Sequence, residues 1–349
     1  MASLSSQDNA EYINYRTMTP TNRKIKVCLV GAGVWGRQHA RVFSQRPDVQ
    51  LCAVAGRTLA KTRARASEFG LRAYTSLQEM LAVEKPDLVS LSLPNLEHFA
   101  ATMQVIEGGY PLLVEKPLTF DLAEADRLLA EAEKRGLFFA INFNHRYAKP
   151  LRLAREAIKA NRLGDITHAI WRFGGEANVS SHPQANLIET QCHGFDQLED
   201  LCGPIASVMA EMTDRTGGGY RTMALALRFV NGAVGSMTGT YDSSYAYQDT
   251  HRLEINGTRG RLVVEDTVRR FSFQQLGSET AEIWQPGYFN DFDCEFHRTF
   301  DTHLDAVLDA FKRGDSPPVH ASAGRRALQL AWAAIESFES GKRVLLTSR

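Results

Sequence analysis

The sequence has few cysteines, and their positions argue against a disulfide-bonded scaffold. The five thiols are scattered over 349 residues, at Cys28, Cys52, Cys192, Cys202 and Cys294. Small secreted domains that depend on disulfides carry more cysteines, usually an even number at close spacings. We therefore expect reduced thiols and a cytoplasmic protein.

Excess charge and long apolar runs are missing as well. Lys and Arg together number 40, as do Asp and Glu, so the formal net charge is zero. There is thus no electrostatic case for binding nucleic acid or an anionic membrane. No apolar run approaches the roughly 18 residues that a membrane-spanning helix needs. Residues 1–24 lack the apolar core of an export signal, and we expect a flexible tail or an arm that packs on a partner subunit.

The chain has no internal repeat, and it is longer than one hydrophobic core usually serves. After the tail we expect two domains, residues 25–145 and 146–349. In the first, short apolar segments alternate with helical stretches, which predicts an α/β, doubly wound Rossmann domain with a parallel sheet. The expected strands are 25–30, 50–55, 72–74, 87–93, 112–115 and 137–142, and the clearest helices are 34–43, 97–107 and 122–135.

The pattern changes after about residue 165. Short segments joined by turns, including the hairpin pair Asn231-Gly232, predict a mostly antiparallel sheet. Helices would cover one face of this sheet, and we expect the open face to form a homodimer or homotetramer. The expected strands are 165–173, 206–212, 222–229, 233–240, 251–256, 261–264 and 270–275, and the helices are 150–161, 187–202, 291–313 and 321–340.

Three glycines stand where the first strand passes into the first helix. The run Gly31-Ala-Gly33-Val34-Trp35-Gly36 has the spacing and the setting of a dinucleotide-binding turn. Gly31 would allow the tight turn, Gly33 the approach of a pyrophosphate, and Gly36 close packing of helix on strand. Val34 and Trp35 begin the helix, whose unpaired N–H groups and dipole favour phosphate.

The end of the second strand indicates which cofactor binds. An NAD enzyme usually has Asp or Glu there to bind the ribose hydroxyls, whereas this chain has Gly56 followed by Arg57 and Thr58. A guanidinium in place of a carboxylate fits a 2′-phosphate. We therefore predict NADP(H) as the favoured cofactor, with NAD(H) as the alternative.

Two further strands also end in polar residues. Ligands of a doubly wound sheet bind at the carboxyl ends of its strands, so Pro94, Asn95 and, one turn later, His98 are expected at the cofactor. Asn95 equally fits a helix cap. The next strand ends in Glu115-Lys116 followed by a proline, a candidate for a cis peptide bond. We assign both residues to the cofactor edge, with Lys116 near the nicotinamide, although neighbouring strand side chains point to opposite faces.

One helical stretch of the second domain carries three polar residues whose spacing places them on the same face of the helix. Glu189, His193 and Asp196 stand at i, i+4 and i+7. Such a face fits catalysis, a structural histidine or a metal site. Because no further strong ligand is evident, we predict no metal. The ordinary pKa of histidine lies near neutrality, which makes His193 the natural proton acceptor.

Together these motifs resemble the Gfo/Idh/MocA oxidoreductases (glucose-fructose oxidoreductase, inositol dehydrogenase and rhizopine-catabolism proteins). The resemblance covers roughly residues 25–349, and its carriers are GAGVWG, LPNLEH, VEKPL, NFNHRYAKP, ETQCHGFD and HASAGRRALQLAWAAIESFESGKRV, in that order. It implies a Rossmann domain followed by an α/β domain whose open-faced sheet serves oligomerisation. It also implies that Lys116 lies at the active site.

The resemblance implies roles in the second domain too. Polyol dehydrogenases of the family read Asp-x-x-x-His-x-x-Asp here, with the His and the first Asp touching the substrate. In this chain Glu189 replaces that Asp, and the usual preceding glycine pair is absent, which leaves the carboxylate's role and the pocket shape open. Asn144 and Arg146 match the family's segment between the domains. With His182, Glu189 and His193 they are substrate-binding candidates, and Arg146 equally fits a structural ion pair.

These residues predict hydride transfer between a nicotinamide and a sugar, cyclic polyol or related hydroxy or keto compound. Lys116 and His193 would handle the proton together. Glu189 or Asp196 would orient the imidazole or a substrate hydroxyl. Two alternatives stay open: a redox-neutral NAD-dependent glycosidase that keeps its nicotinamide bound, and a nucleotide-sensing regulator without catalysis.

Overall fold

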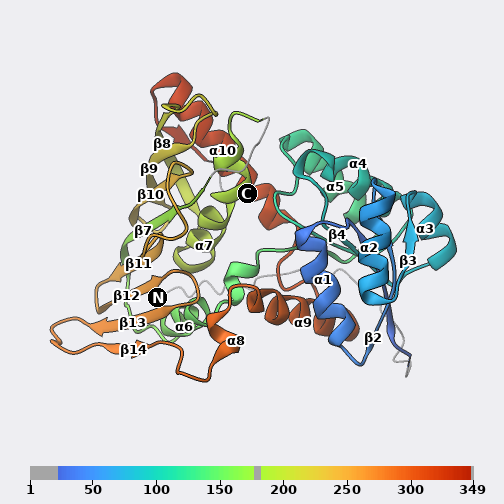
Figure 1. The fold of residues 1–349 in the computed structure, drawn as a ribbon. Coiled ribbons are helices and arrows are strands. Elements are labelled where there is room, and N and C mark those ends of the chain that lie inside the picture. Colours follow the sequence, from blue (N-terminus) through green and yellow to red (C-terminus); the bar gives the residue numbers. More distant parts are fainter. Residues whose placement is uncertain (1–22, 177–181, 347–349) are drawn as a thin grey trace, which may run out of the picture.

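The structure is a computed structural model that describes residues 23–176 and 182–346. Two domains lie side by side, the N-terminal one on the right of Figure 1 and the C-terminal one on the left. Within those two ranges, none of the helices combines the length and the apolar character needed to cross a membrane.

The N-terminal domain is built on a six-stranded parallel sheet in the order β3-β2-β1-β4-β5-β6, which confirms the doubly wound Rossmann prediction. Three strands, β4, β5 and β6, end one or two residues earlier than expected, and the residues that follow them, Ser92, Glu115 and Asn142, are themselves buried. The strands are β1 Ile25–Val30, β2 Val49–Ala55, β3 Arg72–Tyr74, β4 Leu88–Leu91, β5 Leu112–Val114 and β6 Phe139–Ile141.

Helices cover both faces of this sheet. Asp121 caps one of them by accepting a hydrogen bond from the main-chain N–H of Glu124, and Ser76 does the same for Glu79. The helices are α1 Val34–Gln45, α2 Leu59–Phe69, α3 Leu77–Glu84, α4 His98–Glu107 and α5 Leu122–Lys134.

A helix from the far end of the chain completes this domain. Helix α9 (Arg298–Arg313) packs against α1, and Phe300, Leu304 and Leu308 join the hydrophobic cluster formed by β1 and α1. Arg41 of α1 donates two hydrogen bonds to the Asp301 carboxylate, at 2.8 and 2.6 Å. The segment 146–349 therefore contributes one helix to the N-terminal core.

The C-terminal domain contains a nine-stranded mixed sheet in the order β14-β13-β12-β11-β7-β10-β9-β8-β15. All of its pairings are antiparallel except β10 with β7, and the Asn231-Gly232 turn joins β9 to β10 as predicted. The two short edge strands β14 and β15 were not anticipated. The strands are β7 Ile166–Gly174, β8 Ile205–Thr213, β9 Thr222–Phe229, β10 Val234–Thr240, β11 His251–Gly257, β12 Gly260–Glu265, β13 Arg270–Gln275, β14 Glu282–Trp284 and β15 Val344–Leu345.

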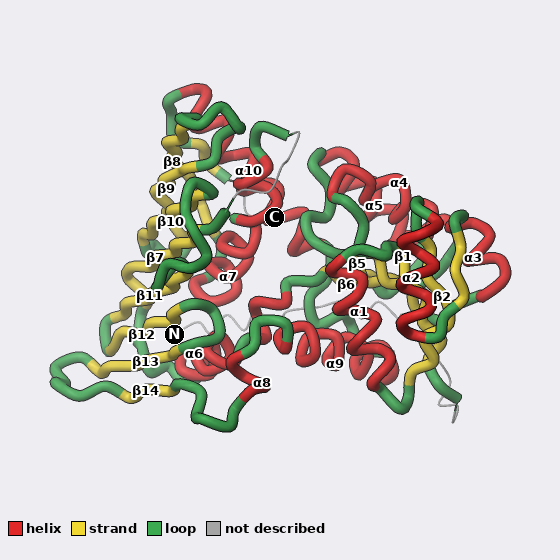
Figure 2. Tube along the Cα trace, in the orientation of Figure 1, coloured by secondary structure: helices red, strands yellow, loops and turns green. Residues whose placement is uncertain are grey.

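Helices lie on the face of this sheet that looks toward the N-terminal domain, and the opposite face is open (Figures 1 and 2). Helix α7 packs on β7 at Gly194, where a Cβ atom would come within 2.7 Å of the Trp171 ring and 2.9 Å of the Met237 methyl. The small residue thus brings the amino end of α7 close to the sheet. These helices are α6 Lys149–Lys159, α7 Cys192–Cys202 and α10 Ser322–Ser340, and the short α8 Asp291–Cys294 precedes α9.

Candidate active site

A crevice of about 570 Å³ opens at the carboxyl ends of β1, β2 and β4. Of the predicted cofactor-binding residues, seven line it, and Glu189 reaches it from the C-terminal domain. The lining residues are Gly31, Ala32, Gly33, Val34, Trp35, Gly56, Arg57, Thr58, Lys61, Thr62, Ser92, Leu93, Pro94, Leu96, Glu97 and Glu189.

The glycine turn has the shape that a bound dinucleotide requires. Gly31 has a φ of +115°, and a Cβ there would overlap the Ser92 carbonyl. A Cβ on Gly36 would overlap the Gly31 carbonyl, so Gly36 serves packing beneath the turn. At Gly33 no described atom lies within 4 Å of such a Cβ, which leaves room for phosphate. Within the described chain no side chain caps α1, so its first N–H groups remain available to an anion.

The ribose end of the crevice is basic. Arg57 lies at the rim with 77% of its side chain exposed, and it forms an ion pair with Glu97, which was not predicted. A Cβ on Gly56, the position that carries a carboxylate in NAD enzymes, would come within 2.5 Å of Thr62 Oγ1, so a side chain there would require Thr62 to move. Lys61 adds a second cation to the lining.

His98 lies behind the crevice lining rather than in it. Its side chain is buried, with Nδ1 2.8 Å from the Pro117 carbonyl and Nε2 2.9 Å from the Leu93 carbonyl. It therefore ties the loop after β4 to the loop after β5, and this replaces the cofactor contact that we expected. Asn95 begins a 3-10 turn, and its side chain lies outside the described part of the structure.

Glu115 points away from the crevice into a buried polar network. Its carboxylate accepts hydrogen bonds from His39 Nε2 at 2.9 Å and from Asn142 Nδ2 at 2.6 Å. His39 Nδ1 lies 2.7 Å from Ser90 Oγ, and Asn142 Oδ1 lies 2.6 Å from His303 Nδ1. The network joins three strand ends of the Rossmann sheet to α1 and α9. The expected cofactor contact of Glu115 is thus replaced by a supporting role, because the strand turns this side chain to the face opposite Lys116.

Lys116 spans the two domains. Its Nζ donates a hydrogen bond to the main-chain carbonyl of Glu189 at 3.0 Å, and the Lys116–Pro117 bond is cis. The residue is partly buried and stands directly after β5, at the same sheet edge as the crevice.

His193 lies in the first turn of α7, just after a π-helical turn over Asn186–Thr190. Its ring is buried and stacks on the ring of His145, with centroids 3.8 Å apart and planes 4° apart. Its Nδ1 has no hydrogen-bond partner in the described chain. Burial lowers the pKa of His193 well below its ordinary value, and the neighbouring histidines and Lys116 lower it further. The ring is therefore neutral, the form that accepts a proton.

Asp196 does not orient this imidazole. Its carboxylate accepts two hydrogen bonds from the Arg146 guanidinium, at 2.8 and 2.5 Å, and Arg146 also binds Asp200 at 3.0 Å. The π-helical turn precedes α7, so the regular i, i+4, i+7 spacing from Glu189 does not hold in the structure. Asp196 and Arg146 form a structural ion pair, which was one of the two roles considered for Arg146.

Two other substrate-binding candidates lie at different depths. Asn144 is buried and donates to Thr299 Oγ1 at 2.7 Å, so its amide serves the join between the domains. The His182 side chain is partly buried, and its ring centroid lies 4.6 Å from that of Phe120, a residue of the loop that follows Lys116.

Sequence reasoning missed His145 altogether. His145 belongs to the NFNHRY motif, but no pattern of neighbouring residues indicates that it stacks on His193, which lies 48 positions further along the chain. The structure also gives no metal centre: within 23–176 and 182–346, no three His, Cys, Asp or Glu side chains gather as ligands.

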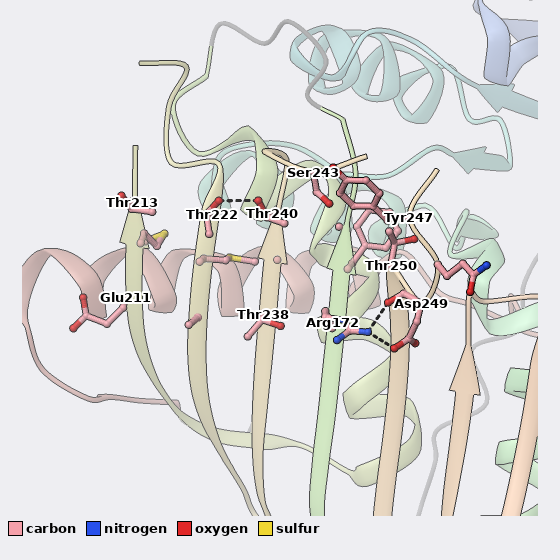
Figure 3. Close-up of a pocket in the computed structure, with 17 residues that line it drawn as sticks. Arg172, Glu211, Thr213, Thr222, Thr238, Thr240, Ser243, Tyr247, Asp249 and Thr250 are labelled. Carbon is pink, nitrogen blue, oxygen red and sulfur yellow. Dashed lines mark hydrogen bonds and ion pairs between the residues drawn. The ribbon is translucent and has the colours of Figure 1, made fainter. Parts of the chain in front are cut away.

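A larger hollow, of about 730 Å³, lies on the open face of the C-terminal sheet (Figure 3). Threonine hydroxyls from several strands line it, including the hydrogen-bonded pair Thr222–Thr240, and Arg172 forms an ion pair with Asp249 at its side. Its described lining shares no residue with the crevice. It carries none of the predicted site residues, so we place the chemistry in the smaller crevice.

Comparison with protein families identifies the chain. The family described as "Oxidoreductase family, NAD-binding Rossmann fold" matches residues 25–143, and "Oxidoreductase family, C-terminal alpha/beta domain" matches residues 155–346. The chain belongs to the Gfo/Idh/MocA oxidoreductase family. As a Gfo/Idh/MocA protein it has an NAD-binding Rossmann domain, which confirms the expected fold. For the cofactor, this finding supports NAD(H), which was the alternative, and does not support the expected preference for NADP(H).

Several relatives of this Gfo/Idh/MocA protein have named activities. D-glucoside 3-dehydrogenase of Escherichia coli is 32% identical over 148 residues, 42% of each chain. Myo-inositol 2-dehydrogenase of Thermotoga maritima is 22% identical over 342 residues, 92% of this chain and 98% of that one.

Solved structures show the same fold. Levoglucosan dehydrogenase in complex with NADH and levoglucosan superposes with a TM-score of 0.85 at 18% identity, covering 93% of this chain and all of that one (100%). The WlbA dehydrogenase of Bordetella pertussis, in complex with NADH and UDP-GlcNAcA, gives 0.80 at 22% identity, covering 94% and 99%. At these identities the likeness shows the fold alone.

The buried Glu115 network yields a prediction about stability. Burial pushes the pKa of Glu115 up, but the hydrogen bond and charge of His39, with Lys116 and Asn142, hold it below the ordinary 4.5. A depressed pKa stabilises the fold above the ordinary pKa, and this stabilisation is lost as the pH falls through the folded-state pKa. We expect Glu115→Gln to lower the free energy of unfolding by about 1–3 kcal/mol at neutral pH.

Urea unfolding at pH 7 and at about pH 4 measures this effect. The difference in the free energy of unfolding between wild type and Glu115→Gln should be smaller at the lower pH. The exposed control Glu279→Gln should have nearly the wild-type free energy of unfolding at both pH values. A gap that is the same at both pH values contradicts an ionised Glu115.

Proposed function

We propose that the protein is an NAD(P)-dependent dehydrogenase or reductase that acts on a CH–OH group of a sugar, a cyclic polyol or a related hydroxy or keto compound. The observation that carries this proposal is the hydrogen bond from Lys116 to the Glu189 carbonyl. It brings the lysine of the Rossmann edge to the segment that leads into His193, beside the crevice that fits a dinucleotide. The named activities of the relatives, on inositol and on a D-glucoside, support the substrate class.

Each residue has a distinct part in this proposal. A nicotinamide bound in the crevice would supply the chemistry of hydride transfer to or from the substrate carbon. The backbone around Gly33 and the amino end of α1 hold the pyrophosphate. The Lys116 ammonium exchanges the Glu189 carbonyl for the substrate oxygen and polarises it. Neutral His193 accepts the hydroxyl proton during oxidation and returns it during reduction. Glu189, which lines the crevice, binds a neighbouring substrate hydroxyl.

Two observations favour NADP(H) over NAD(H): Arg57 and Lys61 line the crevice after β2, and Gly56 stands where NAD enzymes carry a carboxylate. In this proposal Arg57 leaves Glu97 and binds the 2′-phosphate, because a charge-assisted bond to phosphate is stronger than an exposed ion pair. The solved relatives named above hold NADH, so the preference would set this chain apart from them.

We also propose that the open face of the C-terminal sheet pairs with a second copy of the chain. Its strands alternate buried residues with outward ones, and the outward Val234 is 51% exposed. Sedimentation of the full chain at micromolar concentration should give a dimer or tetramer; a monomer contradicts this arrangement.

The function is tested by a panel of sugars and polyols assayed with NAD and NADP at 340 nm. A net absorbance change that follows substrate turnover is expected. Product without a net change in absorbance would indicate the redox-neutral glycosidase instead, and cofactor binding without any turnover would indicate a sensor.

The proton-handling pair gives the sharpest prediction. We expect Lys116→Ala and His193→Ala each to lower kcat by about a hundredfold or more, because each removes a group that acts on the proton in the transition state. Lys134→Ala and His320→Ala are matched controls outside the site and should keep wild-type kcat. If each site variant kept more than half of wild-type kcat on the true substrate, Lys116 and His193 would not be the proton handlers.

The cofactor preference gives another prediction. Wild type should use NADP with at least about tenfold higher kcat/KM than NAD, and Arg57→Ala should lose about 1.5–3 kcal/mol of NADP recognition, roughly 10- to 150-fold, with little change for NAD. Arg63→Ala, at an exposed arginine of α2, the helix that follows Arg57, is the control. A kcat/KM of wild type that is tenfold higher with NAD than with NADP would contradict this part of the proposal.

A further inference from the structure

His145 lies flat against His193, yet the function proposed above gives it no part. It comes from the 3-10 turn Asn144–Tyr147 that joins the two domains, whereas His193 comes from α7. The ring centroids are 3.8 Å apart and the planes differ by 4°. Both side chains are buried, and Phe143 and Phe296 pack edge-on against them. The stack is therefore a built feature of the core around the site.

The hydrogen bonds of the pair favour two neutral rings. His145 Nδ1 lies 3.3 Å from Gln197 Nε2, one turn along α7 from His193. An amide nitrogen only donates, so with this amide orientation Nδ1 is an acceptor, which an imidazolium cannot offer. His193 Nδ1 is buried without a partner in the described chain. Protonating His193 would leave a buried N–H donor there, which costs the full desolvation penalty of that group.

The surrounding charges act in the same direction. Asp196 and Arg146 neutralise each other, whereas Lys116 carries a positive charge toward the pair. His251 of β11 stands edge-on to His145 at 5.8 Å, and burial lowers its pKa to about 4. Burial also lowers the pKa of His145. The charged and titratable groups that act on the two rings are Lys116 and His251, besides each ring on the other.

We propose that His145 is a positioning residue that holds His193 in one orientation and in its neutral, proton-accepting form. The stacked ring excludes water from one face of His193, and two rings at this distance cannot both carry a charge. Gln197 fixes His145 in turn, so the amide acts on His193 through the stack. The catalytic consequence rests on the proposed function, in which His193 accepts the substrate proton, but the state of the ring can be measured without any turnover.

The test compares His145→Asn with wild type by NMR titration of 13C-labelled histidine, with the His193 signal assigned by its loss in His193→Gln. Asparagine removes the stacked ring and admits water, so the pKa of His193 should rise toward the ordinary pKa of histidine. In parallel, kcat/KM should fall about tenfold relative to wild type at about pH 5.5 and change little at about pH 8.5. A structural defect would lower activity equally at all pH values.

Two further variants sharpen the result. His145→Phe keeps a flat ring against His193 and should keep the His193 titration low, and it serves if His145→Asn does not fold. His320→Asn, at the histidine just before α10, is the matched control and should change neither readout. An unchanged His193 titration in His145→Asn, or a titration that rises equally in His145→Phe, overturns the role of the stacked ring. Absence of turnover in wild type would contradict the proposed function, while the ring titration would still decide the inference.

Discussion

The hydrogen bond from the Lys116 ammonium to the Glu189 carbonyl is the interaction on which the site depends. Lys116 belongs to the edge of the Rossmann sheet where cofactors bind, and Glu189 belongs to the π-helical turn that leads into α7. Gly194 lets α7 lie close to the C-terminal sheet, so the position of His193 is fixed from behind. This contact joins Lys116 to the segment that precedes His193, and Glu189 also lines the crevice.

A second layer of buried polar groups supports these residues. Glu115, His98 and Asp196 each carry chemistry that suits a ligand, yet each is engaged by the protein itself, through His39 and Asn142, through two main-chain carbonyls, and through Arg146. Buried polar groups need such partners, because leaving one unpaired costs more than the bond contributes. His193 differs from these residues, because its buried Nδ1 has no hydrogen-bond partner in the described chain, and in our proposal it is free to act on the substrate.

The structural features that depend on a pattern of neighbouring residues were predictable from the sequence. The glycine turn, the Rossmann strands and the Asn231-Gly232 hairpin each follow from the φ, packing or periodicity that a few neighbouring residues require. Contacts between distant residues were not predictable in this way: His39 is 76 positions from Glu115, and Arg146 is 50 from Asp196. The helical spacing of Glu189, His193 and Asp196 also misled, because the π-helical turn changes the register just before α7.

The central claim is that Lys116 and His193 act on the same substrate oxygen. A crystal structure of the full chain with the reduced cofactor and a polyol that the panel identifies as a substrate would test it most directly. The account predicts that one substrate oxygen lies within hydrogen-bond distance of both Lys116 Nζ and a ring nitrogen of His193, with Lys116 released from the Glu189 carbonyl. A substrate bound with Lys116 still on that carbonyl and His193 out of reach would contradict it.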